Sequence, residues 1–105
     1  MNKVLLLTGA LAERLVRKYV SESKVKADVK VLPVSVASFI SSRLLVRELK
    51  GIDASKYSMI LVPGLATFDL REAEKELKVP IFKGPKYAAD IPSVLNNLEG
   101  VEFSK

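Results

Sequence analysis

The sequence repeats one pattern four times: a short apolar run, a turn, and a helical segment. The apolar runs begin roughly 25–30 residues apart, which is about the length of one strand-and-helix unit. Strands and helices that alternate in this way are typical of right-handed βαβ units on a parallel sheet. The expected strands are residues 3–7, 28–36, 59–62 and 79–82. We therefore predict one α/β domain, residues 1–105, with a three-layer, Rossmann-like or flavodoxin-like parallel sheet.

The second apolar run, residues 28–36, carries two signs of an edge strand. Lys30 interrupts its apolar residues, so one end of this strand should lie near solvent. Pro33 cannot donate a hydrogen bond to a neighbouring strand, so it should sit at the strand's C-terminal end or on a sheet edge. The strand order 2-1-3-4 follows, because it places this strand at an edge. Residues 101–103 could add a fifth strand, also at an edge.

The expected helices have apolar stripes and recognisable starts. In the first helix, residues 11–20, the stripe that should face the sheet consists of Leu11, Leu15, Val16 and Tyr19. Ser41 or Ser42 could cap the second helix. Asp69, with Glu72 three positions later, predicts a capping box at the start of the third helix.

The composition removes several kinds of chemistry. There is no Cys and no His, which excludes disulfides, thiolate nucleophiles, imidazole bases and the commonest metal ligands. We expect no catalytic residue, no metal and no cofactor. No apolar run approaches the ~20 residues that span a bilayer, and charges soon follow the apolar N-terminal run, so we expect a cytoplasmic protein that binds no membrane. The lack of Cys and Gln, with abundant Lys and Glu, is compatible with a thermophilic source.

The net charge of +5 is unevenly distributed along the chain. Residues 1–56 carry 11 basic and 5 acidic side chains, whereas the remaining residues are close to neutral. A basic half could indicate a nucleic acid or an acidic partner. Because these cations are scattered along the sequence and not clustered, we expect no nucleic-acid binding.

Three glycine-bearing loops mark the place where a ligand would bind. Open parallel sheets bind ligands outside the carboxyl ends of their strands, where the strand order reverses. Here that point lies between the first and third strands, and the loops that meet there are residues 8–10, 63–67 and 83–86. The candidate ligand-binding residues in these loops are Thr8, Gly9, Gly64, Thr67, Lys83, Gly84 and Lys86.

Each loop has a ligand-binding interpretation and a simpler one. Gly9 precedes a helix start, where free N–H groups favour an anion, but the dinucleotide and P-loop spacings are absent and Gly9 could serve only a tight turn. Gly64 could adopt a positive φ that turns backbone N–H groups toward a ligand. Lys83 and Lys86 could hold a phosphate or carboxylate, or they could be solvated lysines of an exposed turn.

Four segments of the sequence resemble a known family. They are LLLTGALAERLVR, VKVLPVSVASFI, YSMILVPGLATFDL and VPIFKGPKYAADIPSVL. They are similar to the N-terminal domain of the archaeal and methylotroph dihydropteroate synthase-related proteins, and KGPKYAAD is the most specific match. Thr67 and Phe68 depart from that pattern, since the family often has Arg-Gly before the residue that matches Asp69.

The resemblance carries implications for the whole protein. In that family the domain precedes a TIM barrel that resembles dihydropteroate synthase, in a setting linked to tetrahydromethanopterin, and hence pterin, biosynthesis. Residues 1–105 would then be the N-terminal part of a longer protein. The barrel would be the C-terminal partner of this domain.

These observations leave three functions open. The first is a non-catalytic accessory domain, or one that binds an anionic small molecule. The second is a protein–protein interaction module that docks onto the barrel or forms a homodimer. The third is a small enzyme that acts on a phosphorylated metabolite and uses Asp69 or Glu13 as its base.

Overall fold

The computed structural model describes residues 3–52 and 56–98. The predicted fifth strand at residues 101–103 lies outside the described residues. The strands are β1 (Lys3–Thr8), β2 (Ala27–Val31), β3 (Tyr57–Val62) and β4 (Ile81–Lys83). The helices are α1 (Glu13–Ser21), α2 (Ser42–Leu49), α3 (Arg71–Leu77) and α4 (Ile91–Asn96). Short 3-10 turns precede three of the helices: η1 (Ala10–Ala12), η2 (Ala37–Phe39) and η4 (Ala88–Asp90).

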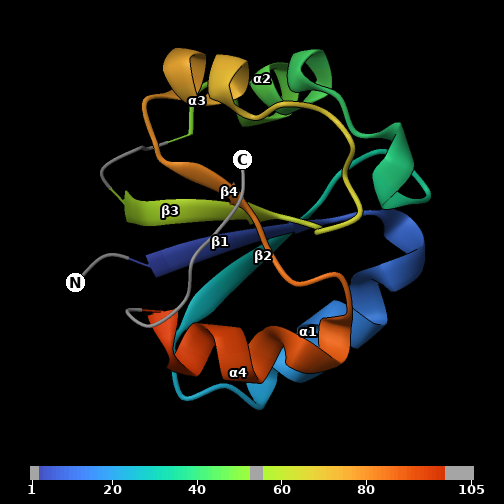
Figure 1. The fold of residues 1–105 in the computed structure, drawn as a ribbon, viewed down its shortest axis with the longest axis vertical. Coiled ribbons are helices and arrows are strands. Elements are labelled where there is room, and N and C mark those ends of the chain that lie inside the picture. The colour runs from blue at the N-terminus through green and yellow to red at the C-terminus, as the bar shows by residue number, and fades with distance from the viewer. Residues whose placement is uncertain (1–2, 53–55, 99–105) are drawn as a thin grey trace.

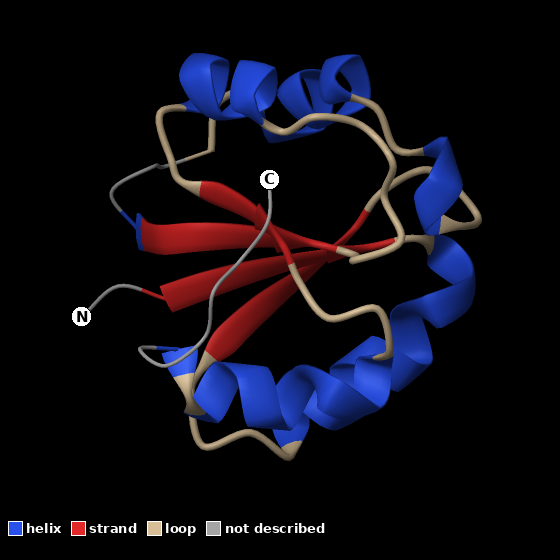
Figure 2. Ribbon diagram, viewed as in Figure 1, coloured by secondary structure: helices blue, strands red, loops and turns tan. Residues whose placement is uncertain are grey.

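The sheet is parallel, and in the described residues its strand order is β2-β1-β3-β4 (Figure 1). α2 and α3 cover one face, while α1 and α4 cover the other, so the sheet is the middle of three layers (Figure 2). This confirms the predicted α/β fold, the strand order and the edge position of β2. Pro33 lies two residues beyond the end of β2, where its missing N–H interrupts no ladder bond.

β1 runs through the middle of the core, and residues 4–8 are all buried. Leu5 and Leu7 belong to the cluster that includes the apolar faces of α2 and α3. Val4 and Leu6 belong to the cluster that includes those of α1 and α4. A parallel strand between two helical layers must be apolar on both faces, which explains why this segment shows no polar alternation. None of the helices in the described ranges has the length and apolarity that a membrane crossing needs.

Two helix starts use the side chains that the sequence suggested. The Leu44 N–H donates to Ser41 Oγ at 3.1 Å, so the first of the two candidate serines caps α2. The Arg71 N–H donates to Asp69 Oδ1 at 2.9 Å, so Asp69 satisfies a free amide at the start of α3. The N-cap residue of α3 is Leu70, which makes no side-chain cap hydrogen bond, so Asp69 lies one residue before the cap and the predicted capping box with Glu72 is not formed.

The inward stripe predicted for the first helix is wrong at two positions. Leu11 is 77% exposed and Leu15 is 49% exposed, whereas Val16 is buried and Tyr19 packs against the core. For Leu11 the cause is local, because it lies in the 3-10 turn η1, which is wound more tightly than the α-helix that follows. Leu15 lies within α1 itself, and its exposure shows that the described elements leave this part of the helix surface uncovered.

The second strand is shorter than the predicted residues 28–36, because its ladder ends at Val31. The Leu32 N–H still donates to the Thr8 oxygen at 2.8 Å, but the Val34 N–H turns back to the Leu32 oxygen at 2.7 Å. The chain beyond Val31 therefore becomes a loop that continues past the end of β1.

Candidate functional site

At the carboxyl edge of the sheet, the loop after β1 is bonded to the loop after β2. The Ala10 N–H donates to the Val34 oxygen at 2.8 Å, and the Leu11 N–H donates to the Ser35 oxygen at 3.2 Å. A Cβ on Gly9 would lie 2.8 Å from the Ser35 oxygen, a separation that side chains essentially never show. Glycine is therefore needed at residue 9 so that these two loops can pack backbone against backbone.

The loops after β3 and β4 form a second bonded pair. The Gly64 N–H donates to the Pro85 oxygen at 3.3 Å, and the Gly84 N–H donates to the Val62 oxygen at 2.7 Å. A Cβ on Gly64 would lie 2.8 Å from the Lys86 nitrogen. The predicted positive φ at Gly64 is wrong, because this glycine serves close approach and not a left-handed turn.

The structure places the seven predicted ligand-binding residues at one edge, in two groups on either side of the β1–β3 junction. Thr8 is buried and donates its hydroxyl to the Gly9 oxygen at 3.2 Å. Gly64 and Gly84 pack together, Lys83 is half-buried, and Thr67 and Lys86 are exposed. The prediction that these residues bind a ligand stays a prediction. The amides of Ala10, Leu11, Gly64 and Gly84, however, already donate to carbonyl oxygens of the chain itself.

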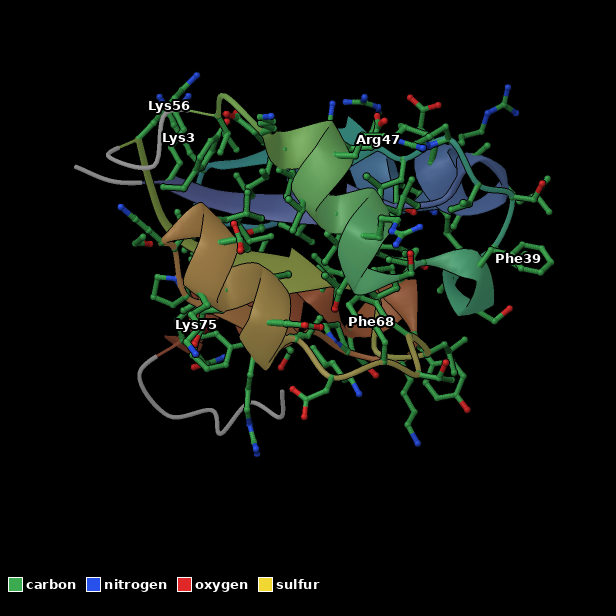
Figure 3. The ribbon with its side chains drawn as sticks, turned by 90° about the horizontal axis from the view of Figure 1, so that it is seen from above. Lys3, Phe39, Arg47, Lys56, Phe68 and Lys75 are labelled. Atoms are coloured by element: carbon green, nitrogen blue, oxygen red, sulfur yellow. The ribbon has the colours of Figure 1, made fainter. Side chains whose placement is uncertain are left out.

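The same edge carries a feature that the sequence did not reveal. In the described part of the chain, large apolar side chains that remain exposed all lie in segments that follow the carboxyl ends of strands. We call this set the apolar rim, and it consists of Leu11, Leu15, Val36, Phe39, Leu65 and Tyr87. Figure 3 shows Phe39 pointing away from the body of the protein, at the opposite end from Lys3 and Lys56. Sequence reasoning assigned the first two to the core and passed over the others, although apolar residues inside turns are a usable signal.

Two hollows formed by described residues lie away from the loops of this edge. One, of about 730 Å³, runs between α2 and α3, where Arg43 and Arg47 face Glu72 and Glu76. Another, of about 610 Å³, lies beside the outer strand β2. Neither contains a residue of the predicted ligand-binding set. The α2–α3 hollow has basic side chains on one wall and acidic side chains on the other, so it has no single charge preference.

A polar cluster joins three strands at the opposite, amino edge of the sheet. The Tyr57 hydroxyl donates to Asp28 Oδ2 at 2.7 Å, while Lys3 Nζ lies 3.6 Å from Asp28 Oδ1 and Lys56 Nζ lies 3.9 Å from Oδ2. The hydrogen bond from Tyr57 and the two lysines lower the pKa of Asp28, against the opposing effect of burial. Burial and the bond to Asp28 raise the pKa of Tyr57 to about 12. Asp28 is thus held ionised by its own neighbours, and its role is to link β1, β2 and β3.

The carboxylates considered as bases have local partners. Glu13 accepts a hydrogen bond from Arg17 Nε at 2.8 Å on the exposed face of α1. Asp69 bonds the Arg71 backbone and lies 3.9 Å from the Arg71 Nε. Neither lines the two hollows. Among residues 3–52 and 56–98, no group of acidic side chains could hold a metal ion.

Comparison with known proteins places the chain in a family. Residues 2–86 match the family of unknown function DUF6513. The chain belongs to this family. The DUF6513 match includes both bonded loop pairs, so the carboxyl edge described above lies within the matched region.

A longer relative shares almost the whole chain. Uncharacterized protein MJ0107 of the archaeon Methanocaldococcus jannaschii is 35% identical over 109 residues, which cover 97% of this chain and 21% of that protein. The chain therefore spans about a fifth of the length of this curated relative. No solved structure matches the chain.

Proposed function

We propose that this DUF6513 chain is a non-catalytic accessory domain, the N-terminal part of a longer cytoplasmic protein. The observation that carries the proposal is the bonded state of the loops at the carboxyl edge. In open α/β sheets this edge is where ligands bind and chemistry occurs. Here the backbone amides that would hold an anion donate instead to Val34, Ser35, Val62 and Pro85. Because these amides are engaged by the chain's own carbonyl oxygens, the edge is better suited to a structural role in an accessory domain than to anion binding or catalysis.

The relative of five-fold greater length and the sequence resemblance suggest what the domain supports. The segment KGPKYAAD resembles the domain that precedes a dihydropteroate synthase-like barrel. The proposal therefore extends to a barrel partner and to a link with tetrahydromethanopterin biosynthesis. In this arrangement the barrel would bind the pterin and perform the chemistry, and the present domain would contribute no reacting group.

The test uses whole MJ0107 and a version that lacks the segment matched by this chain. Binding of pterin phosphates is measured for both by isothermal titration. The proposal expects binding by the whole protein that survives removal of the segment, and no turnover of pterin phosphates by the 105-residue chain alone. Whole MJ0107 that binds no pterin phosphate would contradict the pterin link. Turnover by the isolated chain would contradict the accessory role.

A second candidate function is binding of an anionic small molecule at the β4 loop. The observation that favours it is that Lys83 and Lys86 flank the turn packed on Gly64, and neither forms an ion pair among the described residues. Two unpaired cations on a rigid turn can hold a phosphate or carboxylate. Titration of the chain with pterin phosphates, nucleotides and sugar phosphates tests this function.

The titration compares two double variants that each lose two positive charges, one in the β4 loop and one elsewhere on the surface. Binding should disappear in the double variant Lys83→Ala and Lys86→Ala, and it should persist in Lys24→Ala with Lys75→Ala, two exposed lysines elsewhere on the surface. Equal binding by the two double variants would exclude the β4 loop as the site.

A further inference from the structure

We propose that the apolar rim is the surface through which two copies of this chain form a symmetric dimer. This inference goes beyond the accessory role and does not depend on it. The rim draws on all four strand–helix connections of the described fold, so it is a property of the whole carboxyl edge. Aromatic side chains are enriched in interfaces between proteins. The two most exposed aromatic side chains of the described residues, Phe39 and Tyr87, both lie in the rim.

The exposed apolar area of the rim is large enough for the apolar centre of an interface. An aromatic side chain buries ~150–250 Å² when fully covered. Phe39 is 67% exposed and Tyr87 is 71% exposed, so these two alone offer roughly 200–350 Å². Four aliphatic side chains add to this. Monomeric proteins rarely leave apolar patches of more than a few hundred Å² uncovered. A standard interface buries about 800 Å² per partner, and the rim supplies its apolar centre.

Several backbone amides beneath the rim already form hydrogen bonds within the chain, so a partner can cover them at little cost. Covering an unbonded N–H or C=O group costs its hydrogen bonds to water, which opposes association at most loop surfaces. Beneath the rim, the Ala10 and Leu11 amides donate to the β2 loop, and the Gly64 amide donates to the β4 loop. Loss of water from these loops therefore leaves these amides satisfied. Loop pairs whose amides are already bonded in this way favour a protein interface at the same place.

The rim lies opposite the ends of the described chain. β1 begins with Lys3 at the amino edge of the sheet, and α4 runs back to that edge (Figure 1). There Asn96 Oδ1 accepts a hydrogen bond from the Lys24 N–H at 2.9 Å, in the loop before β2. Both described ends therefore lie at the edge opposite to the rim, and neither covers it.

The rim has one part on each side of the β1–β3 junction. One half, on the β1–β2 side, contains Phe39 and is held by the bond between Leu11 and Ser35. The other half, on the β3–β4 side, contains Leu65 and Tyr87. A two-fold axis through the β1–β3 junction would set each half against the other half of the partner. Such an interface closes on itself and produces a dimer, not an open chain.

The oligomeric state of the 105-residue chain tests the proposal directly. Sedimentation is measured from about 1 µM to about 1 mM, the range of weak to moderate dissociation constants. We expect a reversible monomer–dimer equilibrium within this range. Phe39→Asp and Tyr87→Asp should each raise the dimer dissociation constant at least about ten-fold, because each replaces a large apolar contact with a charge inside the interface.

The control adds the same charge at the opposite edge. Ser58 is exposed at the start of β3, so Ser58→Asp should leave the dissociation constant unchanged. Circular dichroism confirms that each variant is folded, which the exposure of the replaced side chains makes feasible. A chain that stays monomeric throughout the range overturns the proposal. Equal effects of the rim variants and of Ser58→Asp also overturn it.

The absence of Cys from the sequence permits a test of the two-fold arrangement. A Phe39→Cys chain is mixed with a Tyr87→Cys chain that carries a different tag, and the mixture is mildly oxidised. The proposed axis brings these positions together across the interface, so we expect a disulfide-linked product that contains both tags. Ser58→Cys mixed with Tyr87→Cys serves as the control. No more mixed product than this control gives would contradict the arrangement.

Discussion

Gly64 lies so close to Gly84 that a Cβ at residue 64 would stand 2.5 Å from the Gly84 oxygen. Gly84 is less tightly enclosed, because a Cβ on it would meet the Val62 oxygen first, at 3.3 Å. The two glycines therefore differ in what they tolerate, although both belong to the same pair of loops. This asymmetry gives the first prediction.

Gly64→Ala should destabilise the domain by about 2 kcal/mol, because the obstacle is backbone that cannot move aside without loss of the loop pairing. Gly84→Ala should cost less than half as much, since its neighbour needs to shift by only a few tenths of an ångström. Urea unfolding at neutral pH measures both free energies. Equal losses for the two variants would show that the loops are not held in this close contact.

Tyr57→Phe should lower the free energy of unfolding at pH 7 by about 1 kcal/mol, because it removes the hydrogen bond to Asp28. The folded-state pKa of Asp28 is lowered from 3.8, so its stabilising contribution is present above that pH and is lost as pH falls through the folded value. The deficit of the variant should therefore shrink in acid. Unfolding curves at pH 7 and at pH 3 test this. A deficit that is the same at both pH values would contradict the role of the charged carboxylate.

The same pair predicts an effect in alkali. Burial raises the pKa of Tyr57 from 10.0 to about 12. Stability from the neutral hydroxyl is fully present below pH 10.0 and is lost as pH rises toward about 12. Near-ultraviolet absorbance of tyrosinate should reveal one late-ionising group in the native chain, and Tyr57→Phe should lack it. If the late group persists in the variant, it belongs to another tyrosine.

Ser41→Ala should cost about 1 kcal/mol, because the Leu44 N–H at the start of α2 loses its acceptor. Ser41→Asp provides the matched control, since an aspartate at this position can accept the same bond. The aspartate variant should unfold at nearly the native urea concentration, and the alanine variant earlier. An aspartate variant as unstable as the alanine variant would mean that the serine acts in some other way than as a cap.

Substitution by alanine should have very different effects on stability at two adjacent residues of α1, Leu15 and Val16. Val16 is 8% exposed and lies against β1, so Val16→Ala should cost about 1–3 kcal/mol through lost packing. Leu15→Ala should change stability by no more than about 0.5 kcal/mol, because its side chain is largely in water. Measured below the concentration of self-association, a large loss for Leu15→Ala would show that this side chain packs within its own chain.

The elements of the fold could be predicted from the sequence because their signals are local. Residues 4–7 are apolar without alternation, which is the mark of a strand between two helical layers. Lys30 and Pro33 placed β2 at an edge, and the strand order followed. The start of α2 was narrowed to Ser41 or Ser42, and that of α3 to the residues beside Asp69, because a polar side chain at a helix start needs only the next few amides.

What the sequence alone determined, then, is the order and kind of the elements, and three glycine-bearing loops at one edge. Only the tertiary structure decided how those loops use their backbone groups. The bonds of Ala10 to Val34 and of Gly64 to Pro85 join segments from different strand–helix units, so no local pattern encodes them. Leu15 is exposed for a similar reason, since a helical stripe fixes the spacing of apolar residues and not whether another element covers them. Whether a side chain is buried depends on which other element packs against it, and that is decided only when the chain is folded.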